Sequence, residues 1–347
     1  MPDKHHQEPN EQPIESSVPG QFRGIPLKQW SIIIPALNEE KHIGACLDSI
    51  CGLDSSQEEI EVLVVDNGST DRTVAVVNSY SDRIDVRVLV RSDLRVGGLR
   101  NAAAQLACGR YLAFLDADCL APSNWIETAS RIFLEYPGTI TGSPYALPVD
   151  AGWPARIWHQ RFHRNKKGEV SYVPGGNLLL ERTLFWKIGG FDSFLRSNED
   201  SQFCSRALNR GTRVLAFPEL AVVHLGAEKN LRHFARRQLW HGSNVCNHAG
   251  IRGNSRAIGL AGYTLFCALL IAAGLLLWQS KLLLAAFAGL LLPPITMAPS
   301  KAKQHLRLMP KLVVLILTYA LVRAYALPIA AFRGLRDCHL RQRQERI

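Results

Sequence analysis

Four short apolar runs that alternate with helical patterns constrain the fold more than any other feature of this 347-residue chain. Residues 30–35, 61–66, 86–90 and 111–116 are β-branched or aliphatic runs of strand length. The stretches between them have apolar residues at helical spacing or are rich in small residues, and no hairpin turn joins two runs. Because strands that alternate with helices form a parallel sheet covered on both faces, the sequence predicts an α/β domain.

The polar residues that follow these runs predict where the domain binds its ligand. In open parallel sheets, ligands bind beyond the carboxyl ends of the strands. Seven acidic or amide residues occupy such positions, after the first, second and fourth runs: Asn38, Glu39, Glu40, Asp66, Asn67, Asp116 and Asp118. We therefore expect one site at this edge of the sheet.

Asp116 and Asp118 form the motif with the clearest chemistry. Two carboxylates separated by one residue, directly after the run YLAFL, can share a divalent cation that also binds phosphate oxygens. The same pattern occurs in solvated turns, and its position after a buried strand favours the metal. Asp66 has two interpretations of equal weight, a contact to a nucleobase or ribose and a turn or capping aspartate. Glu199 and Asp200, taken alone, indicate only the negatively charged start of a helix.

Charge is distributed unevenly along the chain, whose net charge is +10. Residues 31–150 carry a net charge of −8, whereas residues 151–256 and 257–347 carry +10 and +9. Three apolar stretches lie in the last of these segments. Basic residues beside apolar stretches are typical of proteins at a membrane surface rather than of proteins that bind nucleic acid.

The three apolar stretches differ in how well they fit a membrane-spanning helix. The first, 257–278, has 22 uncharged residues, which is long enough to cross a bilayer. The second, 282–298, contains two adjacent prolines, and the third, 312–332, contains Arg323 and Pro328. Because the loop after the second stretch and the C-terminal tail are both basic, the positive-inside rule places them in the cytosol with the domain. We therefore predict two spans and favour a re-entrant or interfacial position for the third stretch.

Seven segments, in order, resemble those of the family 2 glycosyltransferases, which have the GT-A fold. They are IIIPALNEE (32–40), VVDNGSTDRT (64–73), GGLRNAAAQLACGRYLAFLDADC (97–119), PGGNLLLER (174–182), GGFD (189–192), NEDSQFCSRALNRG (198–211) and RRQLWHG (236–242). Each segment alone is a weak signal, and their order makes the resemblance specific. The chain departs from the family at Asn67, where aspartate is frequent, and at Gln202 and Phe203, which replace the last two residues of the EDxDL pattern.

The resemblance implies a role for each matching residue. It assigns six residues to the nucleotide-sugar site: Pro35, Asn38, Glu40, Asp66, Arg100 and Asp116. It assigns Asp118, with Asp116, to Mg²⁺ or Mn²⁺ on the donor diphosphate, and Asp200 to the catalytic base. Three residues fall at the diphosphate and acceptor contacts of membrane-bound relatives: Glu199, Arg237 and Trp240. Four histidines match no zinc spacing, and we expect ordinary polar or capping roles for them: His224, His233, His241 and His248.

These expectations combine into one functional prediction. We expect an inverting, metal-dependent glycosyltransferase that moves a sugar from a nucleotide-diphosphate sugar to a hydroxyl or phosphate of a lipid-linked acceptor. It would work at the cytosolic face of the inner or plasma membrane, in the synthesis of cell-envelope glycans or exopolysaccharides. Its partners would be the nucleotide sugar, the lipid-linked acceptor and membrane lipids, without nucleic acid.

Two alternatives remain beside this prediction. A nucleotidyltransferase would have a glycine-rich basic loop after the first strand, where this chain has PALNEE. An inactive nucleotide-sugar-binding scaffold subunit is disfavoured by four intact carboxylates: Asp66, Asp116, Asp118 and Asp200.

The prediction divides the chain into four parts. A polar, flexible arm (1–30) precedes a GT-A domain (31–245), whose nucleotide-sugar half (31–150) is followed by an acceptor half (151–245). A helical membrane region (257–332) and a basic tail (333–347) complete the chain.

Overall fold

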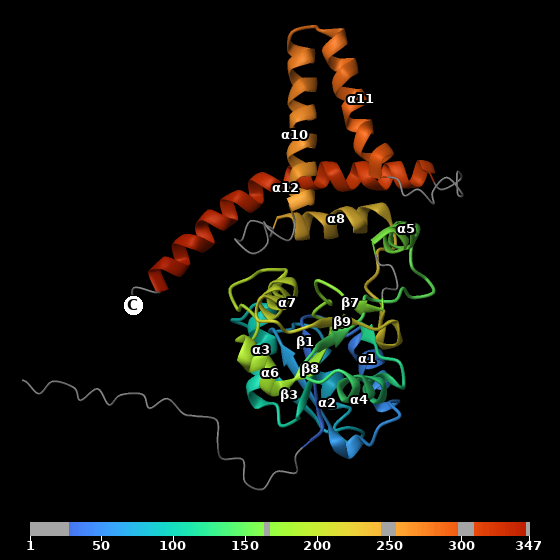
Figure 1. Cartoon of the computed structure of the whole chain (residues 1–347), viewed down its shortest axis with the longest axis vertical. Coiled ribbons are helices and arrows are strands. Elements are labelled where there is room, and N and C mark those ends of the chain that lie inside the picture. The colour runs from blue at the N-terminus through green and yellow to red at the C-terminus, as the bar shows by residue number, and fades with distance from the viewer. Residues whose placement is uncertain (1–27, 163–166, 244–254, 298–308, 345–347) are drawn as a thin grey trace, which may run out of the picture.

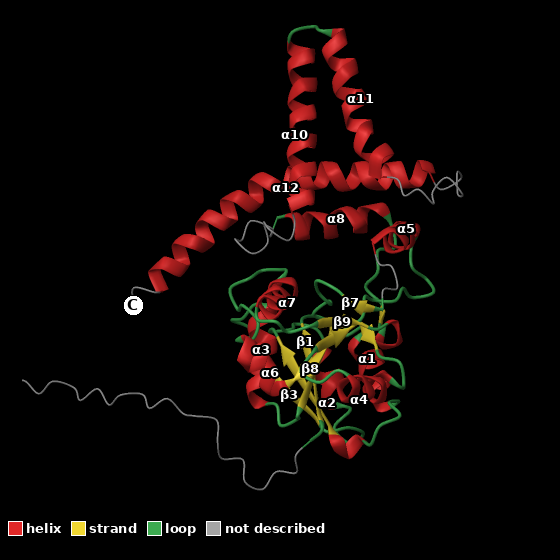
Figure 2. Cartoon of the chain, viewed as in Figure 1, coloured by secondary structure: helices red, strands yellow, loops and turns green. Residues whose placement is uncertain are grey.

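The computed structural model describes residues 28–162, 167–243, 255–297 and 309–344. These residues form an α/β domain followed by a helical region (Figures 1 and 2). The expectations for the N-terminal arm up to residue 27 and for the basic loop 298–308 lie outside the described residues.

A mixed eight-stranded sheet is the centre of the α/β domain. Its strands are β1 (Trp30–Ala36), β2 (Ile60–Asp66), β3 (Val86–Val90), β4 (Tyr111–Leu115), β6 (Ile140–Gly142), β7 (Gly168–Glu169), β8 (Asn177–Glu181) and β9 (Val214–Ala216), in the order β3-β2-β1-β4-β8-β6-β9-β7. The first four strands are parallel and coincide with the four apolar runs. β8 runs antiparallel to both β4 and β6, so the sheet is mixed rather than wholly parallel. A separate two-stranded sheet pairs β5 (Cys119–Leu120) with β10 (Val223–His224).

Helices cover the sheet and continue beyond it. In the domain they are α1 (Ile43–Cys51), α2 (Thr73–Asn78), α3 (Val96–Leu106), α4 (Trp125–Glu135), α5 (Trp153–Phe162), α6 (Arg182–Ile188), α7 (Glu199–Asn209) and α8 (Leu231–Gly242), with short 3-10 helices at Gln57–Glu59 and Pro218–Leu220. Beyond the domain they are α10 (Ser255–Leu276), α11 (Ser280–Met297) and α12 (Met309–Gln344).

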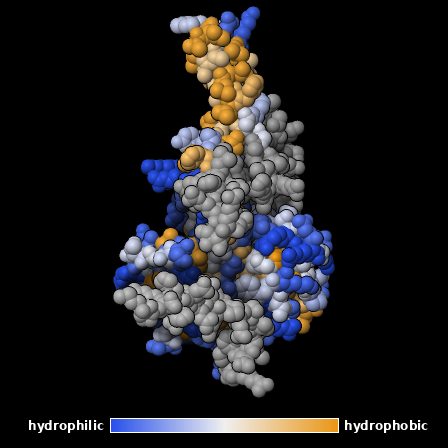
Figure 3. Space-filling view, turned by 90° about the vertical axis from the view of Figure 1, so that its left-hand side faces the viewer, coloured by the Kyte–Doolittle hydropathy of each residue, from blue (hydrophilic) through white to orange (hydrophobic). Residues whose placement is uncertain are grey.

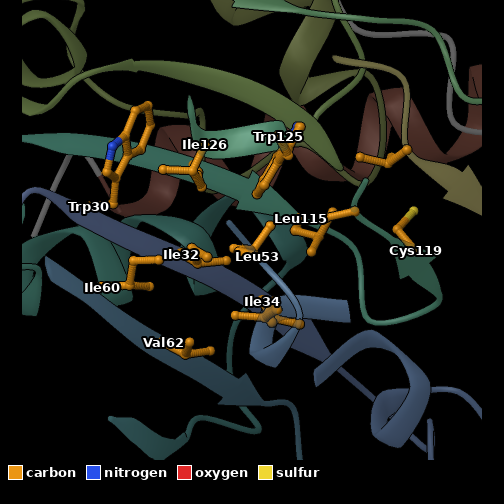
Figure 4. Packing of buried hydrophobic residues seen from close by; sticks show 14 of the residues in the cluster. Trp30, Ile32, Ile34, Leu53, Ile60, Val62, Leu115, Cys119, Trp125 and Ile126 are labelled. Carbon is orange, nitrogen blue, oxygen red and sulfur yellow. The ribbon is translucent and has the colours of Figure 1, made fainter. Parts of the chain in front are cut away.

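The continuous apolar runs have a simple structural cause, because the central strands are buried on both faces. Successive side chains of a strand point to opposite sides of its sheet. Ile32 and Ile34 of β1 therefore join one apolar cluster, and Ile33 joins the other. Figure 4 shows the first cluster, in which the β1 side chains meet Trp125 and Ile126 of α4. The two clusters fix the sheet as a rigid layer whose strand ends can position a site.

The helical region exposes much apolar surface. α10 and α11 stand side by side as a hairpin, and α12 lies across its base (Figure 1). Among the described residues, Gly259–Leu276 and Pro310–Ala330 are long and apolar enough to cross a membrane, whereas the apolar part of α11, Ser280–Leu290, is shorter. A helix in the core of a soluble protein can meet the same criteria, but only 22% of the apolar segment in Gly259–Leu276 and 33% of that in Pro310–Ala330 is buried. The hairpin is correspondingly hydrophobic over most of its visible surface (Figure 3).

The second expected span, 282–298, is therefore not one of the two helices that reach the length and hydropathy of a span. The third stretch and the expected basic tail instead form one helix, α12, which contains Pro328 and continues to Gln344.

α12 packs against the domain through α5 and α8. Ile157 of α5 and Phe234 of α8 form a buried cluster with Leu312, Leu315 and Ile316 of α12. This contact places the third apolar stretch alongside α8, as Figure 1 shows.

Candidate active site

The loops after β1 and β2 are joined by side chains of the predicted site. Asn38 has a positive φ of 56°, and its Oδ1 accepts a hydrogen bond from the backbone N–H of Thr70 at 2.9 Å. Its own N–H donates to Ser69 Oγ at 2.8 Å. Glu40 Oε2 accepts from the N–H of Arg72 at 3.1 Å. Asn38 therefore ties the loop after β1 to the loop after β2.

Pro35 and Asp66 lie at the carboxyl ends of these two strands. Pro35 pairs in register with Val65, one residue before Asp66. Asp66 is 2% exposed, and its Oδ2 accepts hydrogen bonds from the N–H groups of Gly68 and Ser69, both at 2.9 Å. Its Oδ1 is buried and has no partner in the described residues. One oxygen of Asp66 therefore shapes the turn, and the other is available to a ligand donor.

Arg100 connects the carboxylates of the two halves of the predicted site. It is 3% exposed, and its terminal nitrogens donate to Asp116 Oδ1 at 2.8 Å and to Glu199 Oε1 at 2.6 Å. The second oxygen of Asp116 accepts from the hydroxyl of Tyr145 at 2.9 Å. The structure therefore brings Asp116, at the end of β4, next to the first turn of α7.

Asp200 lies in that first turn and is held by the backbone. Its Oδ2 accepts from the N–H of Gly175 at 2.9 Å, and its Oδ1 accepts from the N–H of Ser201 at 2.7 Å. Burial raises the pKa of Asp200 above its ordinary value of 3.8, and the charge of Asp116 adds to this effect. A carboxylate with a raised pKa is a better proton acceptor than an ordinary aspartate.

Four possible metal ligands converge beyond β4. One ligand atom each from Asp116, Asp118, Cys119 and His224 lie within 4.8 Å of one another. His224 Nε2 is 3.5 Å from Asp118 Oδ2. Burial lowers the pKa of His224, which favours the neutral imidazole that binds metals. We expected an ordinary polar role for His224, but β10 pairs with β5 and carries this residue to the Asp116–Asp118 pair.

These residues fit a divalent cation. Two carboxylates and an imidazole are ligands that Mn²⁺ and Mg²⁺ sites accept, although the buried thiol is less suited to these hard ions. Two glycines make room for the carboxylates: a Cβ at Gly176 would lie 2.0 Å from Asp116 Oδ2, and one at Gly226 would lie 2.3 Å from Asp118 Oδ2. A side chain at either position would therefore displace a carboxylate of the pair.

The last two predicted residues lie on α8. Arg237 Nε is 3.6 Å from Glu228 Oε1, and Gly226, two residues before Glu228, packs against Asp118, so Arg237 lies near the possible metal ligands. Trp240 is 51% exposed, and its ring centroid lies 4.9 Å from that of His241. Arg237 is therefore adjacent to the carboxylate site, whereas Trp240 lies on the outer side of the helix.

The fold and the site together define a class of protein. A parallel β1–β4 unit is extended by antiparallel β8, with a DxD pair at the end of β4 and an acidic pair at the start of α7. This combination agrees with the GT-A architecture that the resemblance implied.

The comparisons with known proteins point to the same family as the seven segments. Residues 31–189 match the sequence profile described as "Glycosyl transferase family 2". This match supports a glycosyltransferase family 2 domain in this part of the chain.

Two curated relatives are glycosyltransferases of which the chain covers only part. Validoxylamine A glucosyltransferase of Streptomyces hygroscopicus subsp. limoneus is 36% identical over 125 residues, which is 35% of this chain and 27% of that protein. Glycosyltransferase AglE of Haloferax volcanii is 28% identical over 187 residues, which is 52% of this chain and 62% of that protein.

One solved structure extends the similarity over most of the chain. The mannosyltransferase PcManGT from Pyrobaculum calidifontis, in complex with GDP-Man and Mn²⁺, has a TM-score of 0.58 at 19% identity. The alignment covers 89% of this chain and 87% of that one. At this identity the similarity demonstrates the fold.

Proposed function

We propose that this chain is an inverting, metal-dependent glycosyltransferase that takes its sugar from a nucleotide-diphosphate sugar. The observation that carries the proposal is the bridge from Asp116 through Arg100 to Glu199, because it joins a metal-type carboxylate pair to the acidic pair of α7. The family 2 domain and the GT-A fold support the same reaction class.

In this proposal the strand ends bind the donor. Asp66 offers its unpartnered Oδ1 to a donor group of the base or ribose. Asp118, Asp116 and His224 would hold Mn²⁺ or Mg²⁺, and the solved relative with GDP-Man and Mn²⁺ supports this choice. When bound, the cation neutralises negative charge on the diphosphate leaving group. The roles of Pro35, Asn38 and Glu40 would be to shape the loops that lie under the nucleotide.

Asp200 would act as the base on the acceptor side. A hydroxyl that attacks the anomeric carbon must lose its proton, and a single carboxylate on the opposite face is sufficient for an in-line displacement with inversion. Two backbone N–H groups orient the carboxylate of Asp200, and burial raises its pKa. Arg100 would keep Glu199 and Asp116 in place rather than react itself.

The acceptor would be lipid-linked, and the domain would lie at the cytosolic membrane face. The support is the exposed apolar hairpin of α10 and α11 next to a basic part of the chain. On this proposal residues 31–245 form the catalytic domain, residues 257–332 associate with the inner or plasma membrane, and the product enters cell-envelope glycans or exopolysaccharides.

Donor binding by the detergent-purified chain tests the proposal. UDP-, GDP- and dTDP-sugars would be titrated with Mn²⁺ and with EDTA against wild type and Asp118→Asn. We expect one nucleotide class to bind in a metal-dependent way and the variant to lose that binding. If the folded wild type binds no donor, the proposal is wrong.

An inactive nucleotide-sugar-binding scaffold is the second candidate function, because a complete donor site would serve it equally well. Asp200→Asn separates the two candidates. We expect the variant to bind donor as wild type does and to lose sugar transfer, whereas an unchanged cellular phenotype would favour the scaffold.

A further inference from the structure

Arg323 is the only charged residue between positions 312 and 332 of α12. Its side chain points to the contact with α8, where Nη2 donates to Gln238 Oε1 at 3.2 Å. Its Cδ would lie 3.1 Å from a Cβ at Gly242 of α8, so a glycine makes room for it. A cation in an apolar helix is costly and therefore indicates a function.

The charge of Arg323 has no counter-ion within the described residues. Gln238, which accepts a hydrogen bond from Arg323, is neutral. The Nε of Arg323 is buried and has no partner among the described residues. A buried charge without an ion pair is unfavourable, and an anion bound from outside would compensate it.

Two basic residues of α8 accompany Arg323. Arg237 and His241 are four residues apart on one face of α8, next to the face that carries Gln238 and Gly242. Burial, together with the charges of Arg237 and Arg323, lowers the pKa of His241 to about 3, so its ring is neutral at pH 7. The only carboxylate that the structure pairs with these three residues in its described part is Glu228, 3.6 Å from Arg237.

We call the set of Arg237, His241 and Arg323 the basic joint. The two guanidinium groups carry positive charge, and the structure pairs only Arg237 with a carboxylate, that of Glu228, so the basic joint keeps a net positive charge and attracts an anion. It also lies near the possible metal site, because Arg237 Nε is 3.6 Å from Glu228 Oε1 and Gly226, two residues before Glu228, packs against Asp118.

The outer face of α12 suggests the nature of that anion. Four exposed apolar residues follow one another at spacings of seven, four and seven positions: Val314, Leu321, Tyr325 and Phe332. These spacings place them in one stripe, about opposite to Arg323 and the residues packed on α8. α12 therefore presents a lipid-compatible surface on one side and the basic joint on the other, as expected for a helix in the plane of a membrane surface.

We propose that the basic joint binds the phosphate group of a lipid-linked acceptor, with α12 in the membrane surface. The fork of an arginine guanidinium matches phosphate oxygens, and three donor side chains on two helices would fix the phosphate beside the sugar-transfer site. This inference rests on the proposed glycosyl transfer and names phosphate as the feature by which the acceptor is recognised.

Binding of a prenyl phosphate by the full chain in detergent micelles tests the inference. The probes are farnesyl phosphate, farnesol, inorganic phosphate and phosphatidylglycerol. We expect farnesyl phosphate to bind at least about tenfold more tightly than the other three, since both the charge and the prenyl chain contribute. Arg323→Gln should weaken its binding about tenfold to a hundredfold, the effect of one charge-assisted hydrogen bond. Arg323→Lys should lose less, and Arg232→Gln, an exposed arginine in the first turn of α8, should bind as wild type.

Nucleotide-sugar binding with Mn²⁺ on the same samples separates this inference from the proposed function. Donor binding retained in Arg323→Gln shows that the domain is folded, so a loss confined to farnesyl phosphate supports the basic joint.

Farnesyl phosphate binding that is unaffected by Arg323→Gln overturns the inference. So does equal binding of phosphatidylglycerol, which would indicate general headgroup attraction, or of inorganic phosphate, which would indicate a soluble anion. A wild type that binds farnesyl phosphate but no donor refutes the proposed function alone. If Arg323→Gln fails to fold, His241→Ala, which removes another member of the basic joint, carries the same test.

Discussion

The buried guanidinium of Arg100 is the group whose removal we expect to cost the domain most. Arg100→Met keeps the length of the side chain and removes the hydrogen bonds to Glu199 at 2.6 Å and to Asp116 at 2.8 Å. Glu199 then remains buried without its counter-ion. Because removal of one partner of a buried ion pair costs about 3–5 kcal/mol, we expect the free energy of unfolding to fall by this amount. For a domain of this size, Tm should fall by about 6–20 °C.

The pH dependence of this loss identifies its cause. Burial raises the pKa of Glu199 in the wild type, and the Arg100 guanidinium opposes that rise. Without Arg100 the pKa of Glu199 rises further. The full loss of stability should therefore be seen at pH values above the pKa of Glu199 in Arg100→Met. The loss should shrink as the pH falls, because Glu199 is protonated at a higher pH in the variant than in the wild type.

Thermal unfolding followed by circular dichroism, at pH 8 and at pH 5, measures both effects. Arg232→Met, at an exposed position of α8, is the matched control and should melt as the wild type. A stability loss below about 1 kcal/mol, or one that does not change with pH, would refute the reasoning, because a solvated surface ion pair has that magnitude.

Three further predictions concern the proposed reaction. Sugar transfer should decline on acidification at a higher pH than an ordinary aspartate would give, because burial raises the pKa of Asp200 and a protonated base is inactive. A pH–rate profile measures this decline, and a flat profile down to pH 4 would contradict it. Gly176→Ala should weaken Mn²⁺-dependent donor binding at least about tenfold, since its Cβ would lie 2.0 Å from Asp116 Oδ2, whereas Gly262→Ala, with no atom within 4 Å, should not. His224→Gln should weaken Mn²⁺ binding at least about tenfold in calorimetry, and unchanged affinity would remove His224 from the ligand set.

The part of the fold that was predictable from the sequence is the part whose strands are fully buried. β1, β2 and β4 appear as continuous apolar runs because both of their faces are covered. β6, β7 and β10 have two or three residues each, too few for a pattern, and exist through the strands beside them. The reversed direction of β8 was not predictable either, because direction depends on the route of the chain between Leu115 and Asn177.

The candidate site divides in the same way. Asp116 and Asp118 form a local motif at the end of a strand, which selected them from the sequence, whereas Asp200 was selected only by its place among the segments that resemble the family. Tyr145 and His224 have no such motif: each is a single polar residue brought to the carboxylates by pairing that involves distant strands. A short β-branched run that ends in histidine, AVVH, was the only local signal for His224.

The antiparallel pairing of β4 with β8 limits how the chain can be shortened. β4 consists entirely of buried residues, and β8 covers the edge opposite to β1 over its full length. A fragment that ends near residue 150 would keep all of β1 to β4 but expose β4 as a long apolar edge, which is prone to pair with other copies and aggregate. Strands β1 to β4 therefore do not make a self-sufficient fragment, and any soluble truncation of this protein has to retain Asn177–Glu181.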